Sequence, residues 1–344
     1  MPRRTALLVG INYRGTADEL NGCYNDVVNV ATYLRTVLGY APGAITMLTD
    51  GNRGSVFPAS VAPTRQNIIA GLSALVAGMA AGDEAFFHYS GHGTLVRDRN
   101  GDEASGMDSC ICPLDYNVSS AAGGGVITDD EIRALLVNRV PRGARLYVIL
   151  DCCHNGTGCD IRYKYEDFSV LLRPPSAADR TGAVWRTQQK AFADGKYTET
   201  AGEVFMISGC RDEQTSADAY INNAFAGALT YAIFAILRAN QASIRTYSWS
   251  ALLRDVRHFM RANKYTQIPQ LMTGQLITPA RPVFAVVAAA AASGARGGAA
   301  LELSSGASGA VDKGVSASDS SSTLFCFKHK SGSNKSRQGI QFIH

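Results

Sequence analysis

Short apolar runs alternate with longer amphipathic segments along most of the chain. Apolar runs of strand length, which predict buried β-strands, occupy residues 4–12, 45–48, 84–89, 145–150, 203–208 and 269–272. Apolar residues at helical spacing predict helices at 25–38, 64–79, 128–138, 225–239 and 249–262. This alternation predicts an α/β fold with a mostly parallel central β-sheet, flanked by helices on both faces.

Three segments interrupt this pattern. Residues 94–128 break into short strand-like pieces, acidic turns and glycines, which predicts a surface insertion. Residues 162–199 form a long irregular segment, and loops of that length are usually functional or mobile. From residue 285 the chain is rich in Ala, Gly and Ser and loses its periodicity. We therefore expect one domain at 1–284 and a disordered tail at 285–344.

Composition and charge exclude several classes of protein. The chain has 344 residues, of which 46% are apolar, and this is enough for a substantial core. Its net charge of +4 is mild and the basic residues are scattered, so we expect no nucleic-acid partner. The longest apolar run, at 283–292, is shorter than the roughly 20 residues a spanning helix needs, so we expect no membrane partner.

The cysteines favour reduced thiols over disulfides. Eight are present, but Cys152 and Cys153 are adjacent, Cys110 and Cys112 are one residue apart, and no secretory signal is evident. We therefore expect a cytoplasmic protein. A zinc site near Cys159 is disfavoured because no CxxC pair is present and adjacent ligands do not converge easily on a tetrahedral metal.

A thiol and an imidazole follow two of the predicted strands. His92 comes directly after the strand at 84–89, and Cys153 after the strand at 145–150. The carboxyl ends of parallel strands share one edge of a sheet, so both side chains are expected there. A nearby imidazole activates a thiol and then protonates the amine leaving group. Gly93 and the turn at 154–156 offer backbone N–H groups to the oxyanion.

Acidic residues at two predicted helix starts have two interpretations that spacing does not separate. Asp26 enters the first turn of the helix at 25–38, where a carboxylate complements the helix dipole. Thr128, Asp129, Asp130 and Glu131 combine a helix cap with a cluster that would also suit a hard cation. The fragment at 98–103 resembles the start of a calcium loop but lacks the rest of an EF-hand.

Two motifs identify the family that the chain resembles. H-Y-S-G-H-G at 88–93 and D-C-C-H-N-G at 151–156 resemble the two active-site signatures of metacaspases, cysteine peptidases of the caspase-like fold. The resemblance continues in register from 6–13 through 267–270. It is nearest to the single-chain trypanosomatid type, type I-like without a proline-rich or zinc-finger prodomain. Such proteins are expected to be monomers.

The resemblance assigns roles to individual residues. It implies that His92 is the catalytic base and Cys153 the nucleophile, whereas Cys152 is a packing residue. Asp26, Ser90 and Asp151 match the residues that line the pocket for the side chain before the scissile bond. Two carboxylates there would favour Arg or Lys by charge complementarity, so the expected partners are proteins or peptides with these residues before the scissile bond.

The same resemblance implies activation by calcium. Asp108, Asp129, Asp130 and Asp160 match the calcium-binding carboxylates of the family, and oxygen donors suit Ca²⁺. Binding near Asp160 would order the segment at 162–199 and complete the pocket. Basic residues in that segment, such as Lys190 and Lys196, predict self-cleavage.

One departure and two alternatives complete the prediction. Asn155 stands where the family usually has Ser, and we expect reduced or altered activity at most. A catalytically weak or silent scaffold or regulatory protein is the first alternative, but such members usually lose the Cys or the His. A nucleotide binder is the second, and neither G-x-G-x-x-G after the first strand nor a P-loop is present.

Overall fold

The computed structural model describes residues 2–51, 61–101, 106–116, 125–153, 159–166, 186–189, 199–209, 218–221, 224–278 and 280–284. The predicted tail at 285–344, the turn at 154–158 with Asn155, and the two lysines Lys190 and Lys196 lie outside these residues. The predictions made for them, and the domain boundary at residue 284, stay predictions.

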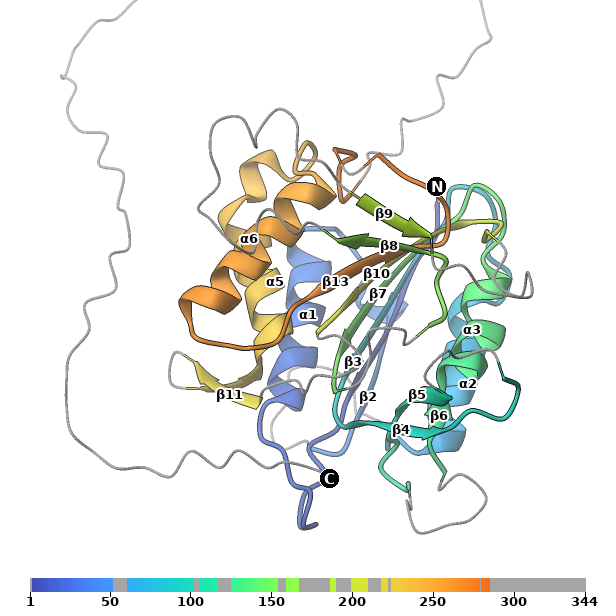
Figure 1. Ribbon diagram of the computed structural model, residues 1–344, viewed down its shortest axis with the longest axis vertical. Coiled ribbons are helices and arrows are strands. Elements are labelled where there is room, and N and C mark those ends of the chain that lie inside the picture. The colour runs from blue at the N-terminus through green and yellow to red at the C-terminus, as the bar shows by residue number, and fades with distance from the viewer. Residues whose placement is uncertain are drawn as a thin grey trace, which may run out of the picture. The chain divides into compact units, whose positions relative to one another are not determined.

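An eight-stranded sheet forms the centre of the described part of the chain (Figure 1). Its strands, in spatial order, are β2 (Ile45–Thr49), β1 (Arg4–Gly10), β3 (Glu84–Ser90), β7 (Arg145–Asp151), β10 (Glu203–Ser208), β13 (Gln270–Thr273), β8 (Tyr163–Glu166) and β9 (Arg186–Gln189). The first five strands are parallel, and the last three pair antiparallel. The predicted α/β fold with a mostly parallel sheet is confirmed.

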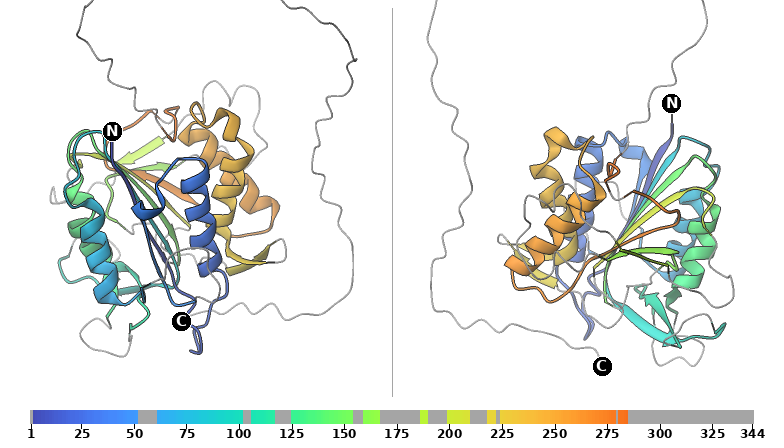
Figure 2. Two further views of the ribbon diagram at one scale, coloured as in Figure 1. Left: turned by 180° about the vertical axis from the view of Figure 1, so that it is seen from behind. Right: turned by 45° about the horizontal axis from the view of Figure 1, so that its top comes forward.

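Helices cover both faces of this sheet. One face packs against α1 (Cys23–Thr36), α5 (Ala228–Ala239) and α6 (Trp249–Ala262), and the other against α2 (Arg65–Val76) and α3 (Asp129–Leu135). Figure 2 shows the two groups of helices on opposite sides of the sheet. Side chains alternate along β1, with Ala6 and Leu8 in the first core and Leu7 and Val9 in the second. No helix of the described part is both long and apolar enough to cross a membrane.

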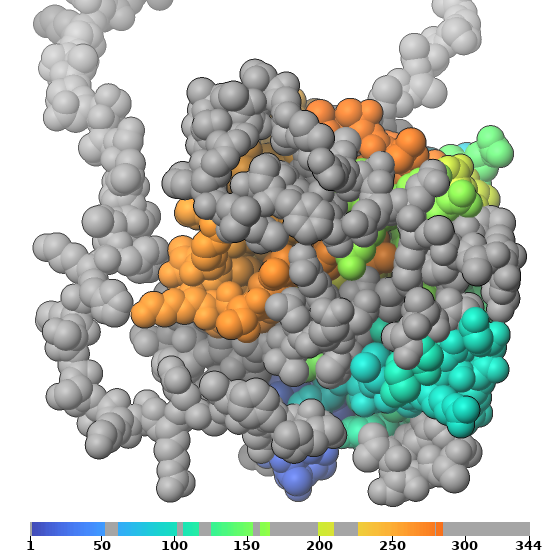
Figure 3. Space-filling model, viewed as in Figure 1, coloured from blue at the N-terminus to red at the C-terminus, as the bar shows by residue number. Residues whose placement is uncertain are grey.

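The predicted insertion after β3 is a small separate sheet. It consists of β4 (Gly93–Arg97), β5 (Met107–Ile111) and β6 (Ile127–Thr128), paired antiparallel. Part of this sheet reaches the surface in the view of Figure 3, where it is teal, while residues 108–111 of β5 are buried. The insertion therefore starts at the residue after His92 and returns to the body of the domain at α3.

Two element predictions need correction. The helix expected at 225–239 begins only at Ala228, because β12 (Ala224–Gly227) pairs with β11 (Asp218–Ile221) before the helix starts. The segment at 162–199, expected to be irregular, contributes β8 and β9 to the sheet. In both places cross-strand hydrogen bonding decided the structure: β11 and β12 form a local hairpin, whereas β8 pairs with β13, about 100 residues further along the chain.

Parallel register brings the polar ends of the strands into one row. Gly10 pairs with Ser90, and Ser90 pairs with Asp151, at the carboxyl ends of β1, β3 and β7. Residues that follow these strands therefore start from neighbouring points on one edge of the sheet.

Candidate functional site

The loops that carry His92 and Cys153 touch each other. Each residue lies two positions beyond the end of its strand, after Ser90 and Asp151 respectively. A Cβ atom on Gly93 would lie 2.2 Å from the Cys153 carbonyl oxygen, so the contact requires glycine at this position. Cys153 is partly exposed, and His92 is 8% exposed. The structure thus places the loops of the two predicted residues against each other, and their catalytic roles stay a prediction.

A backbone carbonyl fixes the tautomer of the neutral His92 ring. The Nε2 atom of His92 lies 2.7 Å from the carbonyl oxygen of Asp18, in the loop between β1 and α1. A carbonyl oxygen only accepts hydrogen bonds, so Nε2 carries the proton and Nδ1 is the basic nitrogen of the neutral ring. Asp18 was missed by the sequence analysis, because any residue type supplies this carbonyl.

Two buried tyrosines hold the backbone of His92. The Tyr13 hydroxyl accepts the His92 N–H at 3.1 Å, and the Tyr89 hydroxyl donates to the His92 carbonyl at 2.7 Å. The Tyr13 ring also lies 4.7 Å from the imidazole. Burial raises the pKa of both tyrosines well above the usual value, so both hydroxyls stay protonated. Tyr13 follows an apolar strand in the sequence, but nothing in that pattern predicted its contact with His92.

The three predicted pocket residues also converge. Ser90 Oγ donates to Asp26 Oδ2 at 2.7 Å, which joins the end of β3 to the first turn of α1. A Cβ atom on Gly227 would lie 2.3 Å from Asp151 Oδ2 and 2.8 Å from Asp26 Oδ2, so the two carboxylates face each other across this glycine. Asp26 and Asp151 are 1% and 4% exposed. Gly227 was missed because its contribution is the absence of a side chain.

Cys152 has a different environment from its neighbour Cys153. Its side chain is 1% exposed and packs in the core between the sheet and helices α2 and α3. A buried thiol in an apolar core behaves as a small hydrophobic residue.

The four carboxylates predicted to bind calcium lie in one region. Asp108 is in β5, Asp129 and Asp130 are in the first turn of α3, and Asp160 follows β7. Burial, with Asp160 and Asp129 nearby, raises the pKa of the Cys159 thiol. Asp108, Asp129 and Asp160 are themselves at most 5% exposed.

These carboxylates already have protein contacts. Asp129 Oδ2 accepts the Ser109 N–H at 3.0 Å, and Asp130 Oδ2 accepts from the Asn100 amide at 2.6 Å. Among the described residues, no group of three or more His, Cys, Asp or Glu side chains is close enough to hold a metal ion. Oxygen donors of this kind fit calcium chemically, but the arrangement described is not an assembled site.

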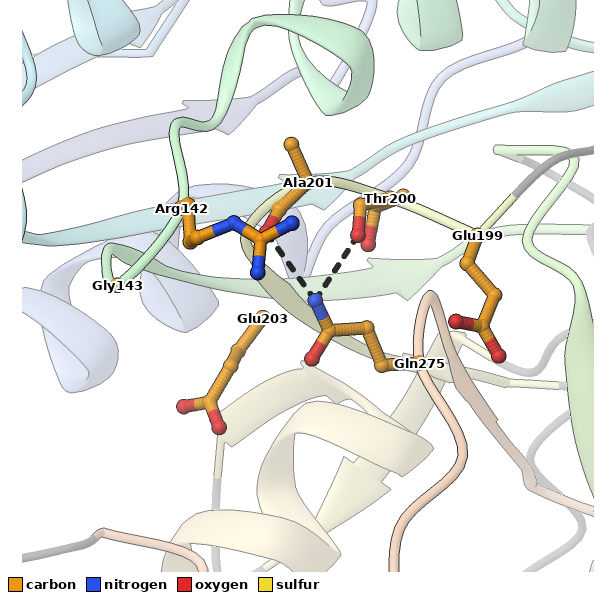
Figure 4. A pocket seen from close by; sticks show the side chains of 7 residues that line it. All are labelled: Arg142, Gly143, Glu199, Thr200, Ala201, Glu203 and Gln275. Carbon is orange, nitrogen blue, oxygen red and sulfur yellow. Dashed lines mark hydrogen bonds between the residues drawn. The ribbon is translucent and has the colours of Figure 1, made fainter.

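A separate pocket lies at the opposite edge of the sheet (Figure 4). It has a volume of about 490 Å³ and is lined by Arg142, Gly143, Glu199, Thr200, Ala201, Glu203 and Gln275. These residues surround the amino ends of β7 and β10, whereas the predicted catalytic residues follow the carboxyl ends. The pocket therefore contributes no residue to the predicted catalytic site.

Comparisons with known proteins identify relatives of this chain. A family model described as "Metacaspase, peptidase C14 domain" matches residues 4–162. Metacaspase-1 of Candida glabrata is 34% identical over 297 residues, covering 78% of this chain and 72% of the relative. Metacaspase-1 of Mycosarcoma maydis is 38% identical over 302 residues, covering 80% and 71% respectively.

A solved structure is similar to this chain in its fold. The crystal structure of a Geobacter sulfurreducens protein is 27% identical and has a TM-score of 0.52, covering 81% of this chain and 96% of that protein. The sequence matches over most of its length show that the chain belongs to the metacaspase family of cysteine-type endopeptidases.

Proposed function

We propose that this protein cleaves peptide bonds after Arg or Lys, with Cys153 as the nucleophile and His92 as the base. The observation that carries the proposal is the meeting of Asp26 and Asp151 across Gly227, at the strand end that leads to Cys153. Two carboxylates buried face to face favour a cation between them, and a guanidinium or ammonium group meets that need. An acidic side chain would add a third negative charge and be disfavoured.

The arrangement around His92 suits acyl transfer. The Asp18 carbonyl holds the Nε2 proton, which leaves Nδ1 to take the proton from the Cys153 thiol. The thiolate attacks the scissile carbonyl, and the imidazolium then gives its proton to the leaving amine. Water, deprotonated by the same imidazole, releases the acyl group from sulfur and restores the thiol. Gly93 packs against the Cys153 backbone, and its N–H is a candidate hydrogen-bond donor to the oxyanion.

A pair of substrates that differ only in charge tests the specificity. Peptidyl-arginine and peptidyl-citrulline amides have nearly the same shape, but citrulline is neutral. We expect kcat/KM to favour arginine by about a hundredfold or more, as for a charged group paired in a buried site. Asp26→Asn and Asp151→Asn should reduce this ratio, and a peptidyl-arginine electrophile should label the wild type but not Cys153→Ala. Equal cleavage of the two substrates would contradict the proposal.

We also propose that calcium activates this peptidase, through Asp108, Asp129, Asp130 and Asp160. The support is the chemistry of the donors and their shared region beside β5 and α3. Bound calcium would supply positive charge to three deeply buried carboxylates. Because no set of three is assembled among the described residues, binding would require these side chains to move together. Self-cleavage is part of this proposal, although Lys190 and Lys196 lie outside the described residues.

Direct binding separates the calcium proposal from the peptidase proposal. Calorimetric titration of Ca²⁺ into Cys153→Ala, which cannot cleave itself, should show binding that Asp160→Asn weakens. In the active protein, a chelator should lower the rate of peptidyl-arginine hydrolysis. Added calcium should lower the intact mass of the chain, because self-cleavage divides it into fragments. Hydrolysis at the same rate with calcium and with a chelator would show that calcium is not an activator.

A further inference from the structure

His88, the first histidine of the H-Y-S-G-H-G motif, has no part in the chemistry described above. Its side chain is completely buried, and burial lowers its pKa to about 3, so the ring is neutral at neutral pH. The Nε2 atom lies 3.0 Å from Thr230 Oγ1, on helix α5. A buried, neutral imidazole that contacts one helix is a positioning group rather than a base.

The turn that His88 contacts also holds both pocket carboxylates. The Thr230 N–H donates to Asp151 Oδ2 at 2.8 Å, and the Gly227 N–H reaches the two oxygens of Asp26 at 2.9 and 3.1 Å. Gly227 is the N-cap of α5, and Thr230 lies in its first turn. The first N–H groups of a helix have no partner within the helix, and the helix dipole favours negative charge there.

Two strands and two helices therefore meet at this point. Ser90, two residues after His88 on β3, donates to Asp26 on α1, while His88 contacts α5. Asp151 at the end of β7 completes the group through Thr230. Gly227 has no space for a side chain, since a Cβ atom would collide with both carboxylates. The orientation of Asp26 and Asp151 thus depends on where the first turn of α5 lies.

We propose that His88, Thr230 and Gly227 are positioning residues of the specificity pocket. His88 holds the first turn of α5 against β3 through the Thr230 hydroxyl, and the N–H groups of that turn aim Asp26 and Asp151 at the substrate cation. This inference rests on the proposed preference for Arg and Lys. It assigns a role to a motif residue and to a helix terminus that do not touch the reacting atoms.

Substitution of Thr230 isolates the side-chain contact. Thr230→Val keeps the backbone N–H and nearly the same volume but removes Oγ1, and Thr230→Ser keeps the hydroxyl. We expect Thr230→Val to raise KM for peptidyl-arginine about fivefold, the effect of one net hydrogen bond, with kcat little changed. Cleavage of peptidyl-citrulline should be unaffected, and Thr230→Ser should restore the KM for arginine. Alkylation of Cys153 by iodoacetamide should keep its rate and pH profile.

A second variant covers the case in which Thr230→Val unfolds. Gln places an amide near the position of Nε2, so His88→Gln should keep arginine selectivity, whereas His88→Leu should reduce it about fivefold at equal melting temperature. Two outcomes would overturn this inference if the wild type prefers arginine substrates. In the first, the variants keep the KM of the wild type for arginine; in the second, they lose cleavage of arginine and citrulline substrates equally. A wild type that does not distinguish arginine from citrulline would instead refute the proposed function.

Discussion

At the scale of single residues, the environment of His92 suits the proton transfer that we propose for it. The Asp18 carbonyl selects the tautomer, the Tyr13 ring lies against the imidazole, and the Tyr13 hydroxyl accepts the backbone N–H of His92. Tyr116 extends this arrangement, because its hydroxyl donates to Asp18 Oδ2 at 2.9 Å and so fixes the residue that supplies the carbonyl. Tyr13 has a φ of 50°, a left-handed conformation that is uncommon outside glycine and starts the turn toward Asp18.

Removing the Tyr13 hydroxyl tests this support. Tyr13→Phe keeps the ring beside the imidazole but loses the acceptor for the His92 N–H and the contact with Tyr89. We expect kcat for peptidyl-arginine to fall about tenfold with KM unchanged, because the base is less well placed while the pocket is intact. Steady-state kinetics measure both constants.

A matched control is available on helix α1. Tyr33 is also buried, and its hydroxyl has no hydrogen-bond partner within the described residues. Tyr33→Phe should leave kcat unchanged and the free energy of unfolding the same or slightly higher, since an unpartnered buried hydroxyl is costly. A similar loss of kcat in both variants would mean that Tyr13 acts only through general stability.

Sequence reasoning found the side chains of the candidate site but not their supports. His92, Cys153 and Asp151 follow apolar strands, so the strand pattern and the parallel sheet predict a common edge. Asp18 contributes a carbonyl and Gly227 contributes space, and neither property depends on a recognisable side chain. Such contacts follow from the packing of distant segments, which the local sequence does not encode.

At the scale of elements, the starts of helices carry much of the site. The helix at 225–239 was predicted, but its true start at Ala228 is what places Gly227 and Thr230 beside the carboxylates. For α3, in contrast, the sequence predicted the start of the helix and its cap correctly. Thr128 accepts the Glu131 N–H and Glu131 accepts the Thr128 N–H, each at 3.2 Å, which is a capping box. Capping is thus established for this turn, whereas its calcium role stays a proposal.

Loss of this cap has a measurable cost. Thr128→Ala should lower the free energy of unfolding by about 1 kcal/mol, because the Glu131 N–H loses its partner. Thr128→Ser keeps the hydroxyl and serves as the control, with little change expected. Urea denaturation followed by circular dichroism measures both. Equal stability of the Ala and Ser variants would show that the hydroxyl does not contribute to the cap.

At the scale of the whole molecule, the two edges of the parallel sheet differ in chemistry. The carboxyl edge carries the candidate site. At the amino edge, Arg4, Glu84, Arg145 and Glu203 pair in register across four strands, and Arg281 continues the row. The ion pairs along this row measure 3.0, 3.0, 2.9 and 2.6 Å. Strand order could not be read from the sequence, so neither could this row.

Substitution of Arg145, at the centre of this row, should change the stability of the fold and leave the candidate active site unchanged. Arg145 bridges Glu84 and Glu203, and its side chain is 16% exposed. Arg145→Met would leave both carboxylates without their shared partner. We expect the free energy of unfolding to fall by about 2 kcal/mol, between the values typical of exposed and of fully buried pairs, because water reaches the edge. Arg254→Met is the control, since its pair with Asp255 is more exposed and should contribute less than about 1 kcal/mol.

The dependence on pH distinguishes lost charge pairing from lost packing. Burial alone would raise the pKa of Glu203, but hydrogen bonds and charge from Arg281 and Arg145 hold it below the usual 4.5. A carboxyl with a lowered folded-state pKa stabilises the fold above its unfolded-state pKa and loses this effect as the pH falls through the folded value. The difference in unfolding free energy between wild type and Arg145→Met should therefore be full at pH 7 and shrink below about pH 4.5. Urea titrations across this range measure it. A constant difference at all pH values would assign the effect to the packing of the Arg145 side chain, and unchanged alkylation of Cys153 would confirm that the opposite edge is intact.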